Sequence, residues 1–304
     1  MTIYDIAKIS GVSKSTVSRV INNDPKVSAE ARETVRRVIR DNNYIPNKNA
    51  RNLSKSPKKT ILILMTRLNS NSENKVLQGI VSSALESCEY MIFETNFSID
   101  LTKSIIQKHN EVDGIIIFAI GNGKYDFLED SIIPVVYVGQ KLYGKNSVYF
   151  NDYEAMNTLL TDCIGNVKSI MYIGIESSDP TTGKLRYFSV ENFCNTNQIE
   201  LSFLETKYRD QDLFNKVTKI DLTKFDAIIC ATDSIALAVY KHMLLHNKKD
   251  IILTGVGNNE DFNFIIDNFI TIEHNYYQAG IDAFDCISKN KTMCMKENFK
   301  IIKY

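Results

Sequence analysis

The sequence has little of what marks several other classes of protein. Its 304 residues include no tryptophan, five prolines and four scattered histidines, and its six cysteines form no Cys-x-x-Cys pair. These counts argue against a disulfide framework or a metal site and favour reduced thiols. The apolar runs, such as residues 115–120, are far too short to cross a membrane, and no basic-then-apolar leader precedes the first predicted helix. We therefore expect a cytoplasmic protein with no cofactor, no metal and no membrane contact.

The net charge is zero, but the charges are unevenly distributed along the chain. Residues 1–60 contain 13 basic and five acidic residues, a net charge of +8, so the rest of the chain carries −8. A basic N-terminal segment on an acidic body is typical of a protein whose N-terminus binds a polyanion such as DNA. The chain is long enough for a small domain followed by a two-lobed core.

Residues 2–21 have the pattern of two short helices joined by a tight turn. Thr2 and Asp5 match a capping box, and Gly11 supplies the left-handed conformation that ends a helix. Ser13 matches the N-cap of the second helix. That helix then exposes short polar and cationic side chains near its N-terminus, which suits phosphates and base edges in a major groove. The alternative interpretation is an amphipathic helical hairpin with a solvated face.

A third helix is predicted from the Ser28 N-cap to about Asn42, with arginines on its outer face. Residues 47–59 form a polar, basic linker that is too short for a stable isolated helix. Leu53 is the odd apolar side chain in this linker. It predicts either a tethering contact with the core or a wedge into a base step of the minor groove.

From residue 60 the pattern changes to short apolar strands that alternate with helices. Such alternation predicts doubly wound parallel sheets with right-handed crossovers, and its length favours two lobes over one. Ligands in these folds bind beyond the carboxyl ends of the strands. The sequence therefore predicts an α/β core with its ligand site at those ends.

Taken together, the chain resembles the LacI/GalR family of bacterial repressors, and the resemblance covers its whole length. In the N-terminal part, the matching segments are Asp5-Ile6-Ala7, Gly11-Val12-Ser13, Thr16-Val17-Ser18-Arg19-Val20, Val27-Ser28, Tyr44-Ile45-Pro46-Asn47 and Ala50-Arg51-Asn52-Leu53. In the core they are Val112-Asp113-Gly114-Ile115-Ile116, Pro134-Val135-Val136, Ala231-Thr232-Asp233-Ser234-Ile235-Ala236-Leu237 and Gly255-Val256-Gly257-Asn258.

The resemblance implies an all-α helix-turn-helix head at residues 1–46, a hinge helix and linker at 47–59, and a periplasmic-binding-protein-like core at 60–304 that binds an effector and dimerises. Its first lobe is expected at about 60–147 and 275–291, and its second at about 148–274 and 292–304. A homodimer carries two heads, so its double-stranded DNA operator is expected to be pseudo-palindromic. The predicted DNA-binding residues are Thr2, Lys14, Ser15, Thr16, Ser18, Arg19, Asn22, Asn47, Ala50 and Leu53.

Four core segments resemble the trehalose-responsive members of the family, which implies trehalose 6-phosphate as the effector. They are residues 66–74, 181–186, 230–233 and 276–280. The residue types agree with this ligand, because arginine and lysine suit a phosphate, while carboxylates and hydroxyls suit a sugar. The predicted effector-binding residues are Arg67, Ser72, Glu73, Gln140, Lys141, Thr181, Thr182, Gly183, Lys184, Arg186, Asp233 and Tyr276.

Two details leave the effector open at this point. Residues 181–184 also match an ordinary helix N-cap and turn. Gln140 stands where the family commonly has an arginine that holds the ligand, and a glutamine cannot clamp an anion bidentately, although Lys141 could compensate.

The leading hypothesis is a transcriptional repressor that a sugar phosphate releases from its operator. The alternatives are a repressor of the same fold that responds to another sugar, a purine or a partner protein, and a non-regulatory sugar-binding protein. An enzyme is not expected, because the chain shows no recognisable nucleophile–base pair or metal set. If the effector were a corepressor, it would tighten DNA binding instead of weakening it.

Overall fold

The computed structural model describes residues 2–21, 24, 26–42, 58–83, 87–121, 123–175, 179–208, 210–248, 250–266, 268–289 and 294–304. The chain divides into two compact units, Met1–Lys58 and Lys59–Tyr304. Nearly all of the predicted hinge segment lies outside the described residues. Four predicted DNA-binding residues also lie outside the described residues and therefore stay predictions. They are Asn22, Asn47, Ala50 and Leu53.

The described part of the first unit contains three helices, α1 (Ile3–Ser10), α2 (Lys14–Ile21) and α3 (Ala29–Asp41). The capping box is present, because the Thr2 amide donates to Asp5 Oδ2 at 2.7 Å and the Asp5 amide donates to the Thr2 hydroxyl at 3.4 Å. Gly11 ends α1 at φ 69°. A small apolar core joins the three helices, and its buried members are Ile6, Ala7, Val17, Val20, Val35 and Val38.

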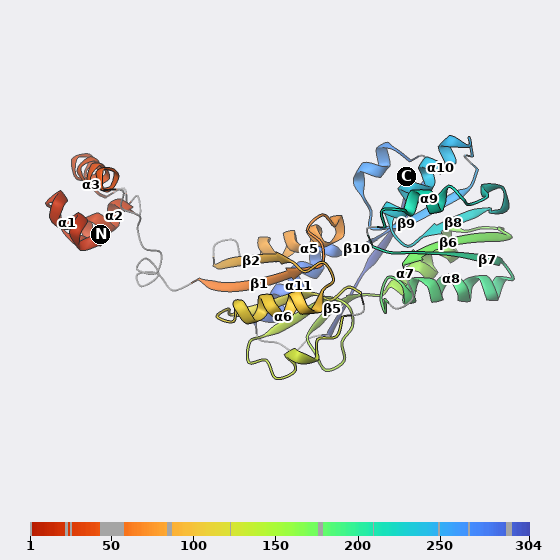
Figure 1. Cartoon of the computed structure of the whole chain (residues 1–304), viewed down its shortest axis with the longest axis horizontal. Coiled ribbons are helices and arrows are strands. Elements are labelled where there is room, and N and C mark those ends of the chain that lie inside the picture. The colour runs from red at the N-terminus through yellow and green to blue at the C-terminus, as the bar shows by residue number, and fades with distance from the viewer. Residues whose placement is uncertain are drawn as a thin grey trace. The chain divides into compact units, whose positions relative to one another are not determined.

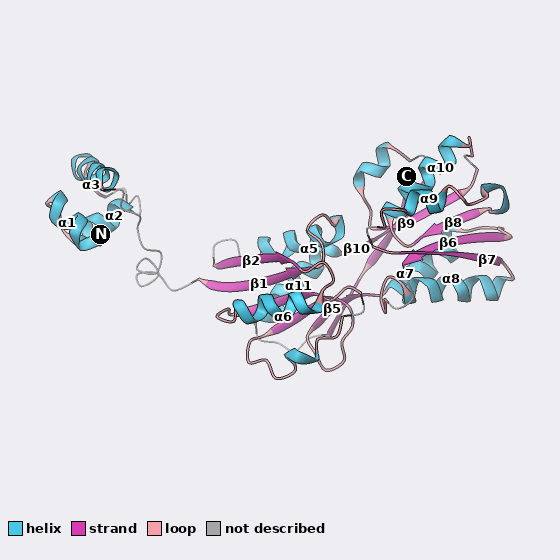
Figure 2. Ribbon diagram, viewed as in Figure 1, coloured by secondary structure: helices cyan, strands magenta, loops and turns pink. Residues whose placement is uncertain are grey.

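The second unit is built on two six-stranded sheets (Figures 1 and 2), which define its first and second lobes. The first sheet has the order β11-β5-β4-β3-β1-β2, with β1 (Lys59–Met65), β2 (Cys88–Glu94), β3 (Gly114–Phe118), β4 (Val135–Gly139), β5 (Ser147–Phe150) and β11 (Cys294–Glu297). The second has the order β12-β10-β9-β8-β6-β7, with β6 (Ser169–Ile175), β7 (Glu200–Thr206), β8 (Ala227–Cys230), β9 (Ile252–Val256), β10 (Phe269–His274) and β12 (Phe299–Lys303).

Helices flank both sheets, as expected for doubly wound α/β lobes. They are α5 (Asn71–Ser82), α6 (Ile99–Lys108), α7 (Asp152–Cys163), α8 (Lys184–Asn197), α9 (Leu213–Val217), α10 (Asp233–Leu245) and α11 (Tyr276–Ser288), with short 3₁₀ turns η1 (Asp126–Leu128), η2 (Leu222–Lys224) and η3 (Glu260–Phe264).

The sheets correct three expectations about strands and lobes. Every pairing is parallel except that of β12 with β10, which is antiparallel. Strands β7 and β11 were not predicted, and both are edge strands with many exposed side chains, so they lack an apolar run. Residues 148–150 and 294–297 belong to the first sheet, and not to the second lobe as predicted, because β5 pairs with β4 and β11 pairs with β5.

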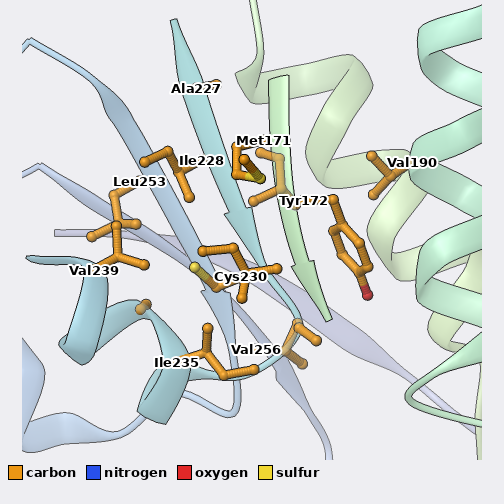
Figure 3. Close-up of a cluster of buried hydrophobic side chains, with 14 of the residues drawn as sticks. Met171, Tyr172, Val190, Ala227, Ile228, Cys230, Ile235, Val239, Leu253 and Val256 are labelled. Atoms are coloured by element: carbon orange, nitrogen blue, oxygen red, sulfur yellow. The ribbon is translucent and has the colours of Figure 1, made fainter. Parts of the chain in front are cut away.

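Alternation along the strands buries both faces of each sheet. On β1, Ile61, Ile63 and Met65 belong to one apolar cluster, and Leu62 and Leu64 belong to another on the opposite face. In the second lobe, residues of β6, β8, β9, α8 and α10 form a continuous buried cluster (Figure 3). These apolar interiors hold the strand ends of each lobe in fixed positions.

The chain passes between the two sheets at three places. These are the links from β5 to α7, from β10 to α11 and from β11 to β12. The ring of His274 lies 5.1 Å from that of Phe150 and 6.2 Å from that of Phe299, so the three links run side by side. They form the hinge region between the lobes.

Helices α5 and α11 cross closely because each has a glycine at the contact. A Cβ at Gly280 would lie 2.0 Å from the Val76 carbonyl oxygen, and one at Gly79 would lie 2.0 Å from the Tyr277 carbonyl oxygen. We expect Gly280→Ala to lower the free energy of unfolding by about 1–3 kcal/mol, because two backbones must separate. Urea unfolding measures this change. Gly165→Ala, where a Cβ meets open space, is the matched control, and equal stability of the two variants would refute the prediction.

Candidate functional site

Helix α2 carries five of the ten predicted DNA-binding residues. Lys14, Ser15 and Arg19 are exposed, while Thr16 and Ser18 are half-buried. The Thr16 amide donates to the Ser13 hydroxyl at 3.1 Å, which confirms the second N-cap. Arg19 Nε lies 3.9 Å from Asp24 Oδ2. Lys14, Ser15 and Thr16 lie at the N-terminal end of α2, where backbone N–H groups and the positive dipole end also favour phosphates, whereas Arg19 lies in the last turn.

Tyr4 is a candidate that the sequence analysis missed. The Lys14 ammonium donates to the Tyr4 hydroxyl at 2.9 Å and lies 4.4 Å from the ring centroid. This hydrogen bond and the lysine charge lower the pKa of Tyr4. Tyr4 is 64% exposed, so its ring and hydroxyl are available beside the predicted recognition helix. A single tyrosine in a capped helix gives no sequence signal for this pairing.

A cavity of about 400 Å³ lies between the two lobes of the core. It is lined by residues at the carboxyl ends of strands from both sheets, including Phe118, Val138, Ile175 and Val256. This is the position predicted for a ligand in doubly wound folds. Eight predicted effector-binding residues line it: Arg67, Ser72, Glu73, Thr181, Thr182, Arg186, Asp233 and Tyr276.

The other four predicted residues are not among those that line the cavity. Gln140 is half-buried, and its Oε1 has no hydrogen-bond partner among the residues that the structure describes. Lys141 is exposed, with its ammonium 5.2 Å from the ring centroid of Tyr143. Lys184 is also exposed, with its ammonium 5.4 Å from the ring centroid of Phe188, and Gly183 is the buried N-cap residue of α8.

Glu73 is a buried acceptor for its own loop. Its carboxylate accepts hydrogen bonds from the Thr66 amide at 2.9 Å, the Thr66 hydroxyl at 2.5 Å, the Arg67 amide at 3.2 Å and Arg67 Nε at 3.3 Å. We expected Glu73 to accept from sugar hydroxyls. Because four donors already occupy the carboxylate, the structure instead makes it the group that fixes the position of Arg67.

The Arg67 guanidinium also makes contacts across the cleft between the lobes. Its central carbon lies 4.9 Å from the ring centroid of Tyr208, in the second lobe, and 5.5 Å from that of Phe97, in the first. The rings of Phe97 and Tyr208 stack at 4.8 Å. The Tyr208 hydroxyl donates to Asp179 Oδ2 at 2.7 Å, which holds this ring in place. Two aromatic faces and one carboxylate thus orient Arg67.

A cluster of buried charged side chains lies on the side of the cavity that faces the three links between the lobes. Asp152 Oδ1 lies 2.8 Å from Arg186 Nε, 2.7 Å from Arg186 Nη2 and 3.1 Å from His274 Nε2. Arg186 also donates to the Ala231 carbonyl. These contacts lower the pKa of Asp152 to about 2, even though burial opposes the charge. Arg186 was predicted to bind the effector, but most of its donors serve this cluster.

Asp233 is the lining carboxylate without a cation within ion-pair distance in the described part of the chain. Its Oδ1 accepts from the Thr271 hydroxyl at 2.7 Å and its Oδ2 from the Asn259 amide at 2.8 Å. Burial raises its pKa to about 6. A carboxylate in this state gains from further donors, which suits the hydroxyl groups of a polar ligand.

The remaining walls combine aromatic and hydroxyl groups. The ring of Tyr276 packs edge-on against Phe150 at 5.1 Å, and burial raises the pKa of Tyr276 to about 12. Thr181 donates its amide and hydroxyl to Asp179 Oδ1 at 2.8 and 2.6 Å. The arrangement offers hydroxyls, one carboxylate, an arginine and aromatic faces, which together suit a polar, ring-shaped ligand.

Three further lining residues, Lys207, Tyr208 and Asp210, were missed from the sequence. All three follow β7, the half-exposed edge strand that the apolar pattern did not predict. Within the described part of the chain, no group of three or more His, Cys, Asp or Glu side chains could hold a metal ion. None of the described helices combines the length and the apolar character needed to span a membrane.

A capped helical hairpin and a two-lobed α/β core with a polar cavity define a ligand-responsive DNA-binding regulator. Residues 2–47 match the family model for bacterial regulatory proteins of the lacI family. The chain is 30% identical over 287 residues to the HTH-type transcriptional regulator TreR of Escherichia coli (strain K12), covering 93% of this chain and 91% of that protein. The chain belongs to the lacI family, and it is a transcriptional regulator and not an enzyme.

Other proteins are similar to this chain over most of its length. The sucrose operon repressor of Staphylococcus xylosus is 29% identical over 299 residues, covering 94% of this chain and 92% of that protein. The solved trehalose repressor from Escherichia coli superposes with a TM-score of 0.73 at 24% identity, covering 81% of this chain and all of that one. The lac repressor dimer bound to operator and the anti-inducer ONPF gives 0.75 at 20% identity, covering 100% and 98%.

Proposed function

We propose that this regulator represses a sugar-utilisation operon, for trehalose, and that trehalose 6-phosphate releases it from its operator. The observation that carries the proposal is the cavity between the lobes, where Arg67 lies in the same pocket as Asp233 and two threonines. Arginine suits a phosphate, and the carboxylate and hydroxyls suit sugar hydroxyls. The similarity to TreR over most of both chains, and to the solved trehalose repressor from Escherichia coli, supports trehalose as the sugar.

On the DNA side, we propose that a homodimer reads a pseudo-palindromic operator. Lys14, Ser15 and Arg19 of α2 reach base edges, and the groups around them contact phosphates. Leu53 and the rest of the hinge segment enter the minor groove at the centre of the site. The exposure of the α2 side chains supports the first part of this arrangement.

The proposed coupling works through the two lobes. A ligand shifts a conformational equilibrium only by its difference in affinity for the two states. An effector that contacts both lobes favours one arrangement of the lobes. The operator is released if that arrangement positions residues 47–59, the predicted hinge helix and linker, poorly for binding DNA. Loss of the hinge contacts leaves weaker binding that depends strongly on salt.

The test is operator release by defined sugars. An operator fragment is first selected from a random-sequence pool with the purified full chain, and its binding is followed by fluorescence anisotropy. We expect trehalose 6-phosphate to raise the apparent dissociation constant by at least about ten-fold, within the usual range of allosteric coupling. Glucose 6-phosphate and trehalose serve as controls. Tighter DNA binding with trehalose 6-phosphate would contradict the inducer role.

A repressor that responds to another sugar is the second candidate. The sucrose operon repressor of Staphylococcus xylosus is nearly as similar to this chain, at 29% identity over 299 residues. Sucrose and sucrose 6-phosphate therefore belong in the same titration. Release by a sucrose compound alone would favour this candidate and leave the repressor function intact.

A further inference from the structure

We propose that the effector's phosphate is held between the two lobes by Arg67 and Lys207, and that Lys184 has no part in binding it. This inference deepens the proposed function and rests on it. Arg67 follows β1 of the first lobe and Lys207 follows β7 of the second, and both line the cavity. The site therefore requires both lobes.

The pairing of charges inside the cavity singles out Lys207. Three of the four lining carboxylates, Glu73, Asp152 and Asp210, each have a cation, since Asp210 Oδ2 lies 2.7 Å from Lys216 Nζ. The fourth, Asp233, accepts hydrogen bonds from the Thr271 hydroxyl and the Asn259 amide. Arg186 is likewise committed to Asp152. The Lys207 ammonium has no hydrogen bond or ion pair with any residue that the structure describes. A cavity with an unneutralised cation attracts an anionic group.

Contacts within the protein orient the Arg67 guanidinium so that it can bind the same anionic group. Glu73 holds its Nε edge, and the rings of Tyr208 and Phe97 support the guanidinium. Tyr208 is the residue directly after Lys207, so the contact between Arg67 and Tyr208 brings the Lys207 backbone to the Arg67 side of the cleft. A phosphate offers several acceptor oxygens, enough for donors from both side chains.

Lys184 was the cation that the sequence favoured, but its position does not serve the cavity. Its side chain is exposed beside Phe188, and it is absent from the lining. Thr181, three residues before it, already donates its amide and its hydroxyl to Asp179.

A phosphate shared between the lobes gives a phosphorylated sugar a contact that the free sugar cannot make. Both cations reach one dianion only when the lobes are close together, because the attraction falls with distance and is screened by water and salt. The phosphate therefore adds affinity for the closed arrangement selectively, which is the requirement for shifting the equilibrium.

The experiment compares Lys207→Met with Lys184→Met in the full-length protein. Both lysines are exposed, so neither change is expected to alter folding, which thermal unfolding checks. Titration calorimetry measures trehalose 6-phosphate and trehalose separately. We expect K207M to weaken trehalose 6-phosphate binding about ten- to a hundred-fold, the usual size of a hydrogen bond to a charged group. Binding of trehalose is expected to change less than about two-fold in both variants.

Operator release distinguishes the two ways of failing. If the wild-type protein is released by trehalose 6-phosphate but K207M responds identically, the inference is refuted and the proposed function survives. The same holds if K184M, and not K207M, loses its response. If no sugar phosphate binds or releases the wild-type protein, the proposed function fails, and the inference fails with it.

Discussion

Replacing Asp152 with asparagine is expected to lower the free energy of unfolding of the core by about 3–5 kcal/mol, the usual cost of removing one partner of a buried ion pair. Arg186 stays buried and charged, with Nε and Nη2 facing an amide in place of a carboxylate. His274 keeps an amide oxygen as a possible acceptor but loses the negative charge beside it. Because these residues join α7, α8 and the end of β10, the hinge region loosens together with the second lobe.

Urea unfolding followed by circular dichroism measures the effect, with Glu154→Gln as the matched control. Glu154 lies on the same helix and pairs with Lys296 at 2.8 Å, but both side chains are about half exposed. A surface pair contributes less than about 1 kcal/mol, so the control is expected to unfold near the wild-type midpoint. Similar losses in the two variants would show that burial of the Asp152 pair does not matter.

The same carboxylate predicts how stability depends on pH. The pKa of Asp152 falls from its ordinary value of 3.8 to about 2 in the folded protein. A group with a depressed folded pKa stabilises fully above its unfolded pKa and loses this contribution as the pH falls through the folded value. We therefore expect the stability difference between wild type and Asp152→Asn to be constant above pH 5 and to shrink between about pH 4 and 2.

Replacing Glu73 with glutamine is the second change with a large expected effect. One face of the new amide is an NH₂ group, which would meet donors of Thr66 or Arg67 in place of an acceptor. We expect a loss of about 1–3 kcal/mol in stability, because buried donors lose their partner. We also expect trehalose 6-phosphate binding to weaken about ten- to a hundred-fold, because Arg67 is no longer held toward the cavity.

Comparing the binding of trehalose 6-phosphate with that of trehalose shows whether Glu73 positions Arg67 or contacts the sugar directly. If Glu73 acts only through Arg67, trehalose binding by calorimetry stays within about two-fold of wild type while the phosphate selectivity is lost. If Glu73 binds sugar hydroxyls directly, as its residue type suggested, both ligands weaken by the same factor. Glu89→Gln, on exposed β2 of the same lobe, is the control for a charge change without a cavity contact.

The N-terminal helices were predictable to within a residue or two. Their signals are local: the Thr2 and Asp5 capping box, the Gly11 turn and apolar residues at helical spacing all operate within one or two turns of chain. The central strands were equally clear, because strands such as β1 and β3 are buried on both faces and form continuous apolar runs. Edge strands β7 and β11 are half exposed, so no run marks them.

The candidate effector site was also only partly predictable from the sequence. The sequence by itself determined that strand ends in an α/β core would carry a polar site, and eight of its predicted residues line the cavity. Only the tertiary structure decided what each side chain does there. Asp152 and His274 meet across 122 positions in the chain, and Tyr208 of the second lobe supports Arg67 of the first. Residue type and local spacing fix the direction of a backbone segment, but the partner of a charge depends on which distant segments packing brings beside it.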